Sequence, residues 1–593
     1  IFDMWIGDWN KTNENWEWQS HTVNDSVIYT PIVIDRNHAF TKVDGVLFKQ
    51  MLKMLSLDFI CNYDSLILKD TKKINKLAFA LDMAVAGRSD ESVWIRQAQE
   101  IRKQMTDSLI DSAFTYLPEG VKHDEIELIK RKLKRRRLEL EAVASQYYRL
   151  LQRTPVVAGT NQSDYFLIER QAPDRTILRI YDPETGDCRL EQQFSGRETK
   201  ELWLYGLAGN DTFEVKGNTR KDFPIYLISG EGENQYQLNH NRKIHVYDKD
   251  YKYDYQKIKY HKISFTPWGI YDSDKGISLG TFFTYTMYGF KRAPFTYQHR
   301  IGYNYLKGFM YAGVFPNYDG RRRLYLNASI SSPRNFENFF GFGNNTAGYK
   351  EEKKNYNRVK LRTYMLNPSF EMDLRKEEVV TFFGSLDMYK AKRTDDRYIY
   401  TVYGEDHPIF RTNYFVGLGA TYRITKQPYS WLPLFETEWT AGWKMNLKKP
   451  ERNFPYAQGS LSWNVRFSDR FTWASLMKGT VLFDNDYEFY QAATIDLRGF
   501  RDNRFIGKQS FYQYSDLRLD MGKLKNPFTP LKYGLFAGFD YGRVWFPGER
   551  SHSWHTSYGG GIWLTFLNKF TTKYSWFGST DSFRFAFELG LGF

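Results

Sequence analysis

The sequence of 593 residues has only two cysteines, Cys61 and Cys188, and it has no long hydrophobic run. Two cysteines cannot build a disulfide framework, and we do not expect these two to be joined. No stretch approaches the roughly 18 consecutive apolar residues that a membrane-spanning helix needs, and the mean hydropathy is -0.59. These shortages exclude a small disulfide-stabilised fold and a helical membrane protein.

Aromatic residues, by contrast, are abundant. They make up 18% of the chain, with 46 Phe, 43 Tyr and 16 Trp. Such a surplus is typical of strands that face lipid and of aromatic girdles at membrane interfaces. A large aromatic-rich soluble β-sandwich is the alternative. The formal net charge of +14 indicates only that anionic lipids or other acidic surfaces will be attracted.

The last eleven residues, FRFAFELGLGF, alternate between two kinds of side chain. On an extended strand, one side carries Phe583, Phe585, Phe587, Leu589, Leu591 and Phe593, and the other carries Arg584, Ala586, Glu588, Gly590 and Gly592. One face can lie in hydrocarbon and the other in a wet lumen only when a closed barrel satisfies the backbone hydrogen bonds. We therefore predict that Phe583, Phe585, Phe587 and Phe593 lie on the last strand of an outer-membrane barrel, at its seam and C-terminal signal.

Period-two patterns continue through the second half of the chain. Fifteen segments are predicted strands: 276–290, 294–306, 309–319, 322–333, 358–374, 378–393, 412–426, 432–446, 454–467, 471–483, 511–521, 531–546, 556–567, 569–577 and 582–593. Single-chain bacterial barrels normally have an even number of strands, so 14 or 16 are expected. We predict 16, with the missing strand near 262–270.

Charged residues alternate with apolar ones in several of these segments. In 358–374, Lys360 and Arg362 alternate with Val359, Leu361, Thr363 and Met365. A Lys or Arg on the lipid face at mid-depth costs about 2–4 kcal/mol, so the charged positions are expected in a wet lumen. The predicted fold class is membrane all-β: a 16-stranded antiparallel transmembrane β-barrel with an N-terminal α+β periplasmic region.

Four regions are predicted along the chain. They are a Trp-rich segment at 1–70, a helical periplasmic region at 71–162, a β-rich periplasmic module at 163–262 and the barrel at 263–593. Within the helical region, the basic run from Arg131 to Arg137 is flanked by acidic residues. This flanking favours a solvated helix face over a phosphate-binding site, and no nucleic-acid-binding module accompanies it.

Two turns in the β-rich module resemble the calcium-binding coil repeat. GLAGNDTFEV (206–215) and SGEGENQYQL (229–238) place Gly and then Asp211 or Asn234 at the repeat's offsets. Two imperfect copies cannot build a stacked ion array. Turns of a small β-helical or meandering plug are therefore expected, and calcium at Asp211 and Asn234 is the lesser alternative.

The most informative loop lies between the predicted strands that end near 483 and begin near 511. Its centre is Leu497, Arg498, Gly499 and Phe500. A fixed guanidinium has no purpose in a loop that extends into water, so we expect the loop to fold into the lumen. A charge screened from water then needs a partner. Asp540 is the candidate, because Gly538 and Gly542 share its inward parity and leave the wall beside it bare.

The motif LRGFRDNRFIG, the segments YSDLRLDMG and GFDYGRVW, and the aromatic C-terminus occur in an order and spacing that resemble a known family. This is the bacterial surface antigen superfamily of BamA, TamA and FhaC type insertases and two-partner secretion translocators. The resemblance covers about 330 residues. It implies a 16-stranded barrel whose sixth extracellular loop carries Arg498, Gly499 and Phe500 to a receptor formed by Gly538, Phe539 and Asp540. It also implies a weak seam where client strands can pair. Leu497 replaces the usual Val.

The family's periplasmic POTRA repeats are absent from this sequence. Instead, MWIGDWNKTNENWEW followed by TPIVIDRNHAF is similar to the catalytic loop and metal-binding Asp of HipA-like kinases. Asn10 replaces the catalytic base, and an amide cannot accept the proton of an attacking hydroxyl. Asp8 and Asp35 remain as possible ligands. We expect a structural relic that packs beneath the barrel. In related Bacteroidetes proteins the resemblance implies an upstream metallophosphoesterase, and because Ile1 follows no signal peptide we expect a longer exported protein.

Two functions from different classes follow. The first is a non-enzymatic protein of the Gram-negative outer membrane that assembles, inserts or translocates other proteins, without a cofactor and without catalytic residues in this chain. Its expected partners are outer-membrane lipids, client outer-membrane proteins and lipoproteins in a larger complex, and no nucleic acid. The second is a barrel that anchors a metallophosphoesterase. A passive porin is disfavoured, because the inward loop and a plug would block its pore.

Overall fold

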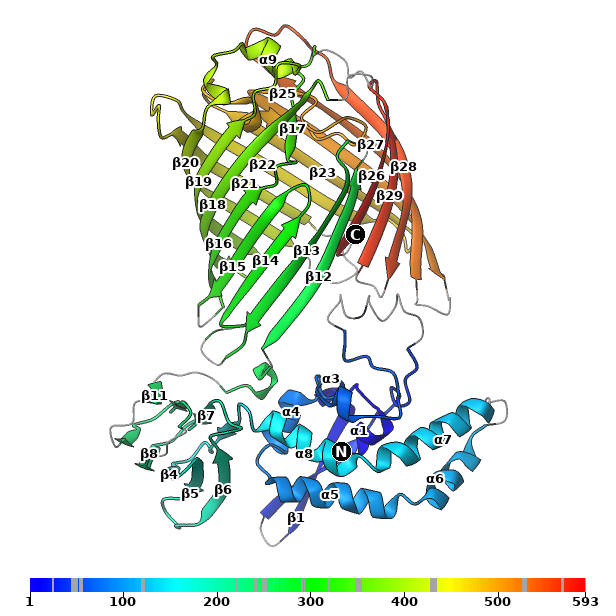
Figure 1. Cartoon of the computed structure of the whole chain (residues 1–593), viewed down its shortest axis with the longest axis vertical. Coiled ribbons are helices and arrows are strands. Elements are labelled where there is room, and N and C mark those ends of the chain that lie inside the picture. Colours follow the sequence, from blue (N-terminus) through cyan, green and yellow to red (C-terminus); the bar gives the residue numbers. More distant parts are fainter. Residues whose placement is uncertain are drawn as a thin grey trace. The chain divides into compact units, whose positions relative to one another are not determined.

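The chain forms two compact units in a computed structural model (Figure 1). They are Ile1–Tyr260 with Gly289–Lys291, and His261–Tyr288 with Arg292–Phe593. The structure describes all residues except 24–25, 44–51, 53–56, 119–122, 219–221, 239–242, 248–252, 260, 273, 290–291, 293, 318–319, 347–354, 427–434, 525–530, 567–569 and 592–593. Each unit has buried hydrophobic clusters of its own.

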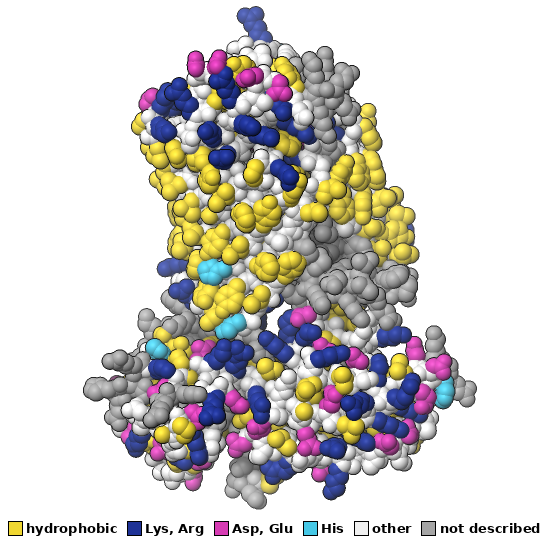
Figure 2. All heavy atoms as spheres, viewed as in Figure 1, with side chains coloured by type: hydrophobic (Ala, Val, Ile, Leu, Met, Phe, Trp, Pro, Cys, Tyr) yellow, Lys and Arg dark blue, Asp and Glu magenta, His cyan; other side chains and the backbone are white. Residues whose placement is uncertain are grey.

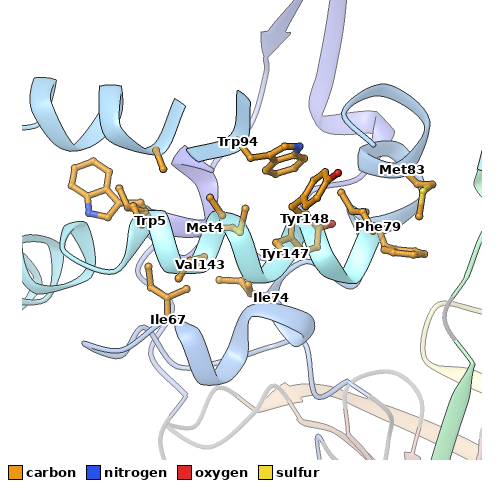
Figure 3. Close-up of a cluster of buried hydrophobic side chains, with 14 of the residues drawn as sticks. Met4, Trp5, Ile67, Ile74, Phe79, Met83, Trp94, Val143, Tyr147 and Tyr148 are labelled. Carbon is orange, nitrogen blue, oxygen red and sulfur yellow. The ribbon is translucent and has the colours of Figure 1, made fainter. Parts of the chain in front are cut away.

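The first part of the N-terminal unit is mainly helical. Its elements are α1 (Phe2–Ile6), the hairpin β1 (Trp16–Val23) and β2 (Ser26–Val33), α3 (Thr71–Ile74), α4 (Phe79–Val85), α5 (Glu91–Gln104), α6 (Asp107–Ala113), α7 (His123–Arg137) and α8 (Leu140–Leu151). Leu140, Val143, Tyr147 and Leu151 recur at three and four residues along α8 and are fully buried. Figure 3 shows Val143 and Tyr147 beside Met4 in this core. Among the described helices, none is long and apolar enough to cross a membrane.

The basic run of α7 differs in part from its prediction. Arg136 is only 3% exposed, and its guanidinium donates to the carbonyl oxygens of Trp5 (2.7 Å) and Asp64 (2.8 Å). Lys134 pairs with Asp111 at 2.8 Å. The interpretation as a solvated face is therefore wrong for Arg136. This residue lies on the same face of the helix as the buried Leu133, and backbone carbonyl oxygens replace water as the acceptors of its guanidinium.

The rest of this unit is built from short strands in two sheets. The strands are β3 (Val156–Ala158), β4 (Tyr165–Gln171), β5 (Arg175–Tyr181), β6 (Cys188–Ser195), β7 (Leu202–Tyr205), β8 (Thr212–Gly217), β9 (Ile225–Ile228), β10 (Gln235–Leu238) and β11 (Ile244–Tyr247). One sheet has the order β10-β8-β4-β5-β6 and the other β11-β9-β7-β3. β4, β8 and β10 are parallel, as are β3, β7, β9 and β11. Successive turns of chain therefore stack, as in a β-helix.

Within the residues that the structure describes, the second unit is an antiparallel barrel sheet with sixteen long strands. They are β12 (Lys262–Asp272), β13 (Gly276–Met287), β14 (Tyr297–Asn304), β15 (Gly308–Pro316), β16 (Arg322–Ser331), β18 (Arg358–Arg375), β19 (Glu378–Ala391), β20 (Asn413–Lys426), β21 (Phe435–Asn446), β22 (Asn453–Arg466), β23 (Phe471–Leu482), β26 (Gln509–Leu524), β27 (Leu531–Trp545), β28 (His555–Phe566), β29 (Phe570–Gly578) and β30 (Phe583–Leu591). The three-residue β17 (Phe336–Asn338) pairs with the start of β18. The predicted fold class is confirmed, and the sixteenth strand is β12.

The two ends of the barrel differ in their connections. Residues 483–508, which link β23 to β26, and residues 392–412, which link β19 to β20 and carry α9 (Tyr398–Tyr403), lie at one end, here called the long-loop end. The two-residue turn between β18 and β19 lies at the opposite, short-turn end. Because strands alternate in direction, β12 begins at the short-turn end. Short turns are typically periplasmic and long loops extracellular.

The outer face of the barrel carries exposed apolar side chains. Trp439 is 61%, Leu418 62% and Tyr558 68% exposed. On β18 the prediction was wrong in one respect: Val359 and Leu361 are buried inside, whereas Lys360 and Arg362 are exposed outside. Alternation shows which residues share a face, but it does not show which face is inside. At the long-loop end the outer surface is polar and the inward loop fills the lumen, so the apolar face of β18 points inward there.

Candidate functional site

The loop between β23 and β26, residues 483–508, packs against the inner wall of the barrel. It contains two short strands, β24 (Ala493–Thr494) and β25 (Ile506–Gly507), which pair with each other. Ile495, Leu497, Phe500 and Phe505, each 2–3% exposed, form a cluster with Val544 of β27. Burial of these apolar side chains fixes the loop in the lumen, and the loop's polar tip lies beside the wall.

Arg498 binds two carboxylates of that wall. Its Nε donates to the Asp540 oxygens at 3.1 and 3.2 Å, and its backbone N–H donates to Asp540 Oδ2 at 3.0 Å. Nη1 pairs with Asp516 Oδ1 of β26 at 2.6 Å. The guanidinium carbon lies 3.9 Å from the ring centroid of Phe577. The cation therefore has acceptors in its plane and an aromatic face above it.

Asp540 is fully buried, and among the described residues its side-chain partners are Arg498 of the loop tip and Ser557 of β28. Ser557 Oγ donates to Asp540 Oδ2 at 2.7 Å, which leaves the guanidinium of Arg498 as the countercharge in direct contact. Asp516 differs, because Lys573 and Arg518 lie 3.7 and 3.6 Å from its Oδ2 atom. The two carboxylates are therefore unequal: Asp540 depends on Arg498, whereas Asp516 has other cations nearby.

Two glycines create the space for this contact. A Cβ atom on Gly538 would lie 2.7 Å from Arg498 Nη2 and 2.8 Å from Asp516 Oδ1. A Cβ atom on Gly499 would lie 2.6 Å from the Ser557 Cβ. Both positions require a bare backbone because loop and wall approach each other closely. Phe539, predicted as part of the receptor, points outward and is 49% exposed, so it does not contact the loop tip as Gly538 and Asp540 do.

Two further arginines of the loop bind the first and the last hairpins of the barrel. Arg501 pairs with Asp274, in the turn between β12 and β13, whose side chain is 1% exposed. Arg504 pairs with Asp581, in the turn between β29 and β30, and its own side chain is 4% exposed. Arg498, Arg501 and Arg504 thus follow one another at intervals of three and reach three separate parts of the wall.

Additional contacts hold the loop tip against the last hairpin. Ser579 Oγ donates to the Gly499 carbonyl oxygen at 2.7 Å, and the Arg584 guanidinium of β30 donates to the Phe500 carbonyl oxygen. On the other side, Lys275 pairs with Asp502 at 2.7 Å. The loop therefore bridges the two strands that close the sheet, β12 and β30.

The seam between β12 and β30 is short. Within the described residues only Tyr271 with Phe587 and Asp272 with Ala586 are in register. By comparison, β12 pairs with β13 from Lys262 to Asp272 along its full length, and β29 pairs with β30 from Phe570 to Gly578. Most of β12 toward the short-turn end is left without a partner on its outer edge among these residues.

The aromatic side chains predicted for the seam lie on β30. Phe583 is 72% exposed, and the Phe585 ring contacts that of Tyr271 at 5.8 Å between centroids. Phe587 contacts Tyr574 of β29 at 5.1 Å. Phe593 lies outside the described residues. The described aromatic side chains therefore line the last hairpin and reach across to β12.

The kinase-like positions are held by local backbone contacts. Asp8 is 2% exposed and accepts the Asn10 N–H at 3.0 Å, and burial raises its pKa. Asp35 accepts the Asn37 N–H at 2.8 Å. Lys11, next to Asn10, is buried and donates to Asn75 Oδ1 at 2.9 Å. Among the described residues, no group of three or more His, Cys, Asp and Glu side chains is placed to hold a metal ion.

The two coil-like turns stack, and a third turn with the same spacing precedes them at Gly159–Asp164. The Asp164 N–H donates to Asp211 Oδ1, and the Asp211 N–H donates to Asn234 Oδ1, both at 2.9 Å. A Cβ on Gly232, whose φ is +120°, would lie 2.0 Å from the Gly209 carbonyl oxygen. Asp211 Oδ1 and Asn234 Oδ1 thus each accept a backbone N–H of the neighbouring turn, so both side chains join successive turns of the stack.

Several residues of the loop contact are not in the sequence prediction. Asp516, Ser557, Asp581 and Arg584 lie on strands or turns that come together only when the sheet curls. Asp516 belongs to the motif YSDLRLDMG and points inward with Arg518, so its parity was a usable signal. The spacing of Arg501 and Arg504 after Arg498 was a second signal, because three cations in one inward loop need three acceptors.

No protein-family model matches this sequence, and no curated protein matches it. Among solved structures, BamA from Haemophilus ducreyi lacking POTRA domains 1-3 is similar, with 11% identity, a TM-score of 0.42, and coverage of 56% of this chain and 71% of that chain. CdiB from Escherichia coli has 10% identity, a TM-score of 0.35, and coverage of 56% and 67%. CdiB from Acinetobacter baumannii has 11% identity, a TM-score of 0.34, and coverage of 57% and 66%.

Proposed function

We propose that this chain is an outer-membrane β-barrel protein that assembles, inserts or translocates other proteins. The exposed outer face supports a lipid environment, because contiguous apolar patches of this kind are rare on proteins surrounded by water. The arginines of the inward loop, by contrast, are paired with carboxylates inside the barrel. The anchored-phosphoesterase alternative concerns a domain before Ile1, and no described residue bears on it.

The short β12–β30 seam is the observation that carries the proposal. A strand with unpaired N–H and C=O groups on its edge accepts another strand, which is the basis of β-augmentation. Here the edge of β12 from Ile263 to Ile270 lies toward the short-turn end, which we assign to the periplasm. A client strand that arrives from that side can pair with this edge before the seam has to open further.

The inward loop has a matching role in this proposal. It occupies the lumen and contacts the hairpins on both sides of the seam through Arg501 and Arg504. We infer that it keeps the two edges at a fixed separation while the seam is at rest. A passive channel is disfavoured, because a loop packed across the lumen blocks a wide pore.

A disulfide across the seam tests the proposal. In a background in which the free thiols Cys61 and Cys188 are replaced by Ser, the pair Tyr271→Cys and Phe587→Cys joins residues that are Cα partners. Oxidation is expected to stop client assembly, measured by quantitative mass spectrometry of outer-membrane proteins in cells whose only copy is the variant. A reductant should restore it.

The matched control is Tyr574→Cys with Phe587→Cys, which ties the same position of β30 to its other neighbour, β29. This pair is expected to leave assembly unchanged, because it does not cross the seam. Unchanged outer-membrane protein levels in the oxidised seam variant, with complete crosslinking verified by gel mobility, would contradict the proposal.

A further inference from the structure

Four cations form a cluster on the outer face of the barrel at the long-loop end, on β18, on β19 and directly after β19. This rim cluster consists of Lys360, Arg362, Lys390 and Lys392, all exposed. Arg362 and Lys390 are Cα partners, and the Lys392 N–H donates to the Lys360 carbonyl oxygen at 2.9 Å. Figure 2 shows Lys and Arg side chains gathered at this end of the barrel, above a band of hydrophobic side chains.

The rim cluster has no acidic partner within the part of the chain that the structure describes. No ion pair or side-chain hydrogen bond is formed there by any of its four members, whereas the next cation along, Arg393, pairs with Glu405. Like charges directly opposite each other on neighbouring strands destabilise a sheet. The pairing of Arg362 with Lys390 therefore calls for an anion from outside this part of the protein.

The depth of the rim cluster identifies that anion. Below Arg362, the outward side chains of β18 from Tyr364 to Leu374 are Tyr364, Leu366, Pro368, Phe370, Met372 and Leu374. At about 3.4 Å per residue and a tilt of about 40°, this stretch is about 26 Å high. The apolar band of an outer-membrane barrel is about 25 Å high. The rim cluster thus lies where hydrocarbon ends and lipid headgroups begin.

The neighbouring strand supports the same boundary. On β20, Tyr414 is 42% exposed and follows the same outward row as Met388 of β19, its Cα partner. Lys448 places its ammonium 5.1 Å from the Tyr414 ring centroid and donates to the Thr412 carbonyl oxygen at 3.1 Å. An aromatic side chain with a cation just above it is typical of a membrane interface.

We propose that the rim cluster binds the phosphates of a phosphorylated glycolipid in the outer leaflet, with the acyl chains lying against Tyr364, Leu366 and Phe370. The inference rests on the membrane orientation in the proposed function, but not on transport. Paired cations on adjacent strands fit a headgroup with two phosphates, since each phosphate accepts charge-assisted hydrogen bonds from Lys and Arg. The ligand class is therefore a bisphosphorylated lipid rather than a zwitterionic one.

Binding to the full chain in phosphatidylcholine nanodiscs tests this, with bisphosphorylated lipid A as the probe and native mass spectrometry as the readout. The variant Lys360→Gln, Arg362→Gln, Lys390→Gln, Lys392→Gln is expected to bind at least about tenfold more weakly. The control carries four changes on the same wall at the short-turn end: Arg321→Gln, Arg322→Gln, Arg375→Gln and Lys376→Gln. It should bind like the parent chain.

Further measurements distinguish binding of the phosphorylated lipid from binding of free phosphate and from a folding defect. The parent chain should bind dephosphorylated lipid A more weakly than bisphosphorylated lipid A, by the same factor as the Gln variant loses. Millimolar inorganic phosphate should not displace the lipid, because the acyl chains contribute to binding. Replacement of the three lysines by Arg keeps the charge and should preserve binding, which guards against a folding defect in the Gln variant. Equal affinity of the Gln variant and the parent chain, or full competition by inorganic phosphate, overturns the inference. A lipid-binding defect with normal client assembly supports it independently of transport.

Discussion

Replacement of Arg498 by Met removes the guanidinium from the loop tip and keeps most of the side-chain volume. Asp540 then loses its contacting cation while it remains fully buried, with only Ser557 and the residue 498 backbone N–H as donors. Breaking a buried ion pair from one side typically costs about 3–5 kcal/mol, because a charge is left without compensation. We expect a decrease in the free energy of unfolding in that range.

Replacement of Asp540 by Asn should cost less, about 1–3 kcal/mol. Arg498 keeps its contact with Asp516 at 2.6 Å, so the cation is not left alone. In the double variant, Asp540→Asn removes the carboxylate charge that Arg498→Met leaves without a countercharge. The two effects should therefore fall short of additivity by about 1–3 kcal/mol, as expected for residues in direct contact. A charge swap is a poorer test, because an acidic residue at 498 would face Asp516.

The assay is urea unfolding of the barrel in lipid vesicles, followed by tryptophan fluorescence, with the parent chain and the three variants at one lipid composition. Arg466→Met is the control: this exposed arginine at the short-turn end donates to the carbonyl oxygens of Ser468 and Asp469, and its change should stay within about 0.5 kcal/mol. Additivity of the two single changes within about 0.5 kcal/mol would refute the idea that this pair holds the loop.

Three further predictions follow from other contacts. Gly538→Ala should lower the free energy of unfolding by about 1–3 kcal/mol in the same assay. The control is Gly479→Ala, whose Cβ would have no neighbour closer than 3.6 Å and which should have no effect. Equal losses in the two variants would contradict the close approach of loop and wall at Gly538. Arg504→Gln removes the buried partner of Asp581 and should speed amide hydrogen exchange in β30, and unchanged exchange would contradict its role. Burial raises the pKa of Asp211 to about 7, so the folded state holds a proton that the unfolded state has lost above about pH 4. Thermal stability of the N-terminal unit should therefore fall between pH 4 and 7, and Asp211→Asn should remove this slope; a slope that persists would contradict the assignment.

The barrel could be predicted from the sequence because its signal is local. Strand alternation has a period of two, and each strand of the second unit repeats it, so the strands were recognisable one by one. The faces of β18 were assigned wrongly because alternation is symmetric: it groups Lys360 with Arg362 but does not say which group is inside. That choice depends on depth in the membrane and on what fills the lumen, and neither is encoded in one strand.

The candidate site could be predicted only in part, for a related reason. Arg498 and Asp540 stood out because each lies in a short glycine-containing motif. Asp581 and Arg584 do not lie in such a motif. They contact the loop only because the last strand, β30, pairs with the first strand, β12, and this long-range pairing cannot be read from the local sequence. The third coil turn, Gly159–Asp164, was hidden because the β5–β6 hairpin separates it from the next rung along the chain.

The relative strengths of the contacts at the seam decide what holds it together. Two registered residue pairs supply a few backbone hydrogen bonds, each worth about 0.5–1.5 kcal/mol net. The pairs of Arg501 with Asp274 and of Arg504 with Asp581 are buried, and separating such a pair costs about 3–5 kcal/mol when one of its charges stays buried without a partner. If the seam widens, Asp274 and Asp581 move apart, and a loop of fixed length cannot stay bound to both. The ion pairs of the loop therefore resist opening more than the strand pairing does, so release of the loop has to precede or accompany any lateral opening.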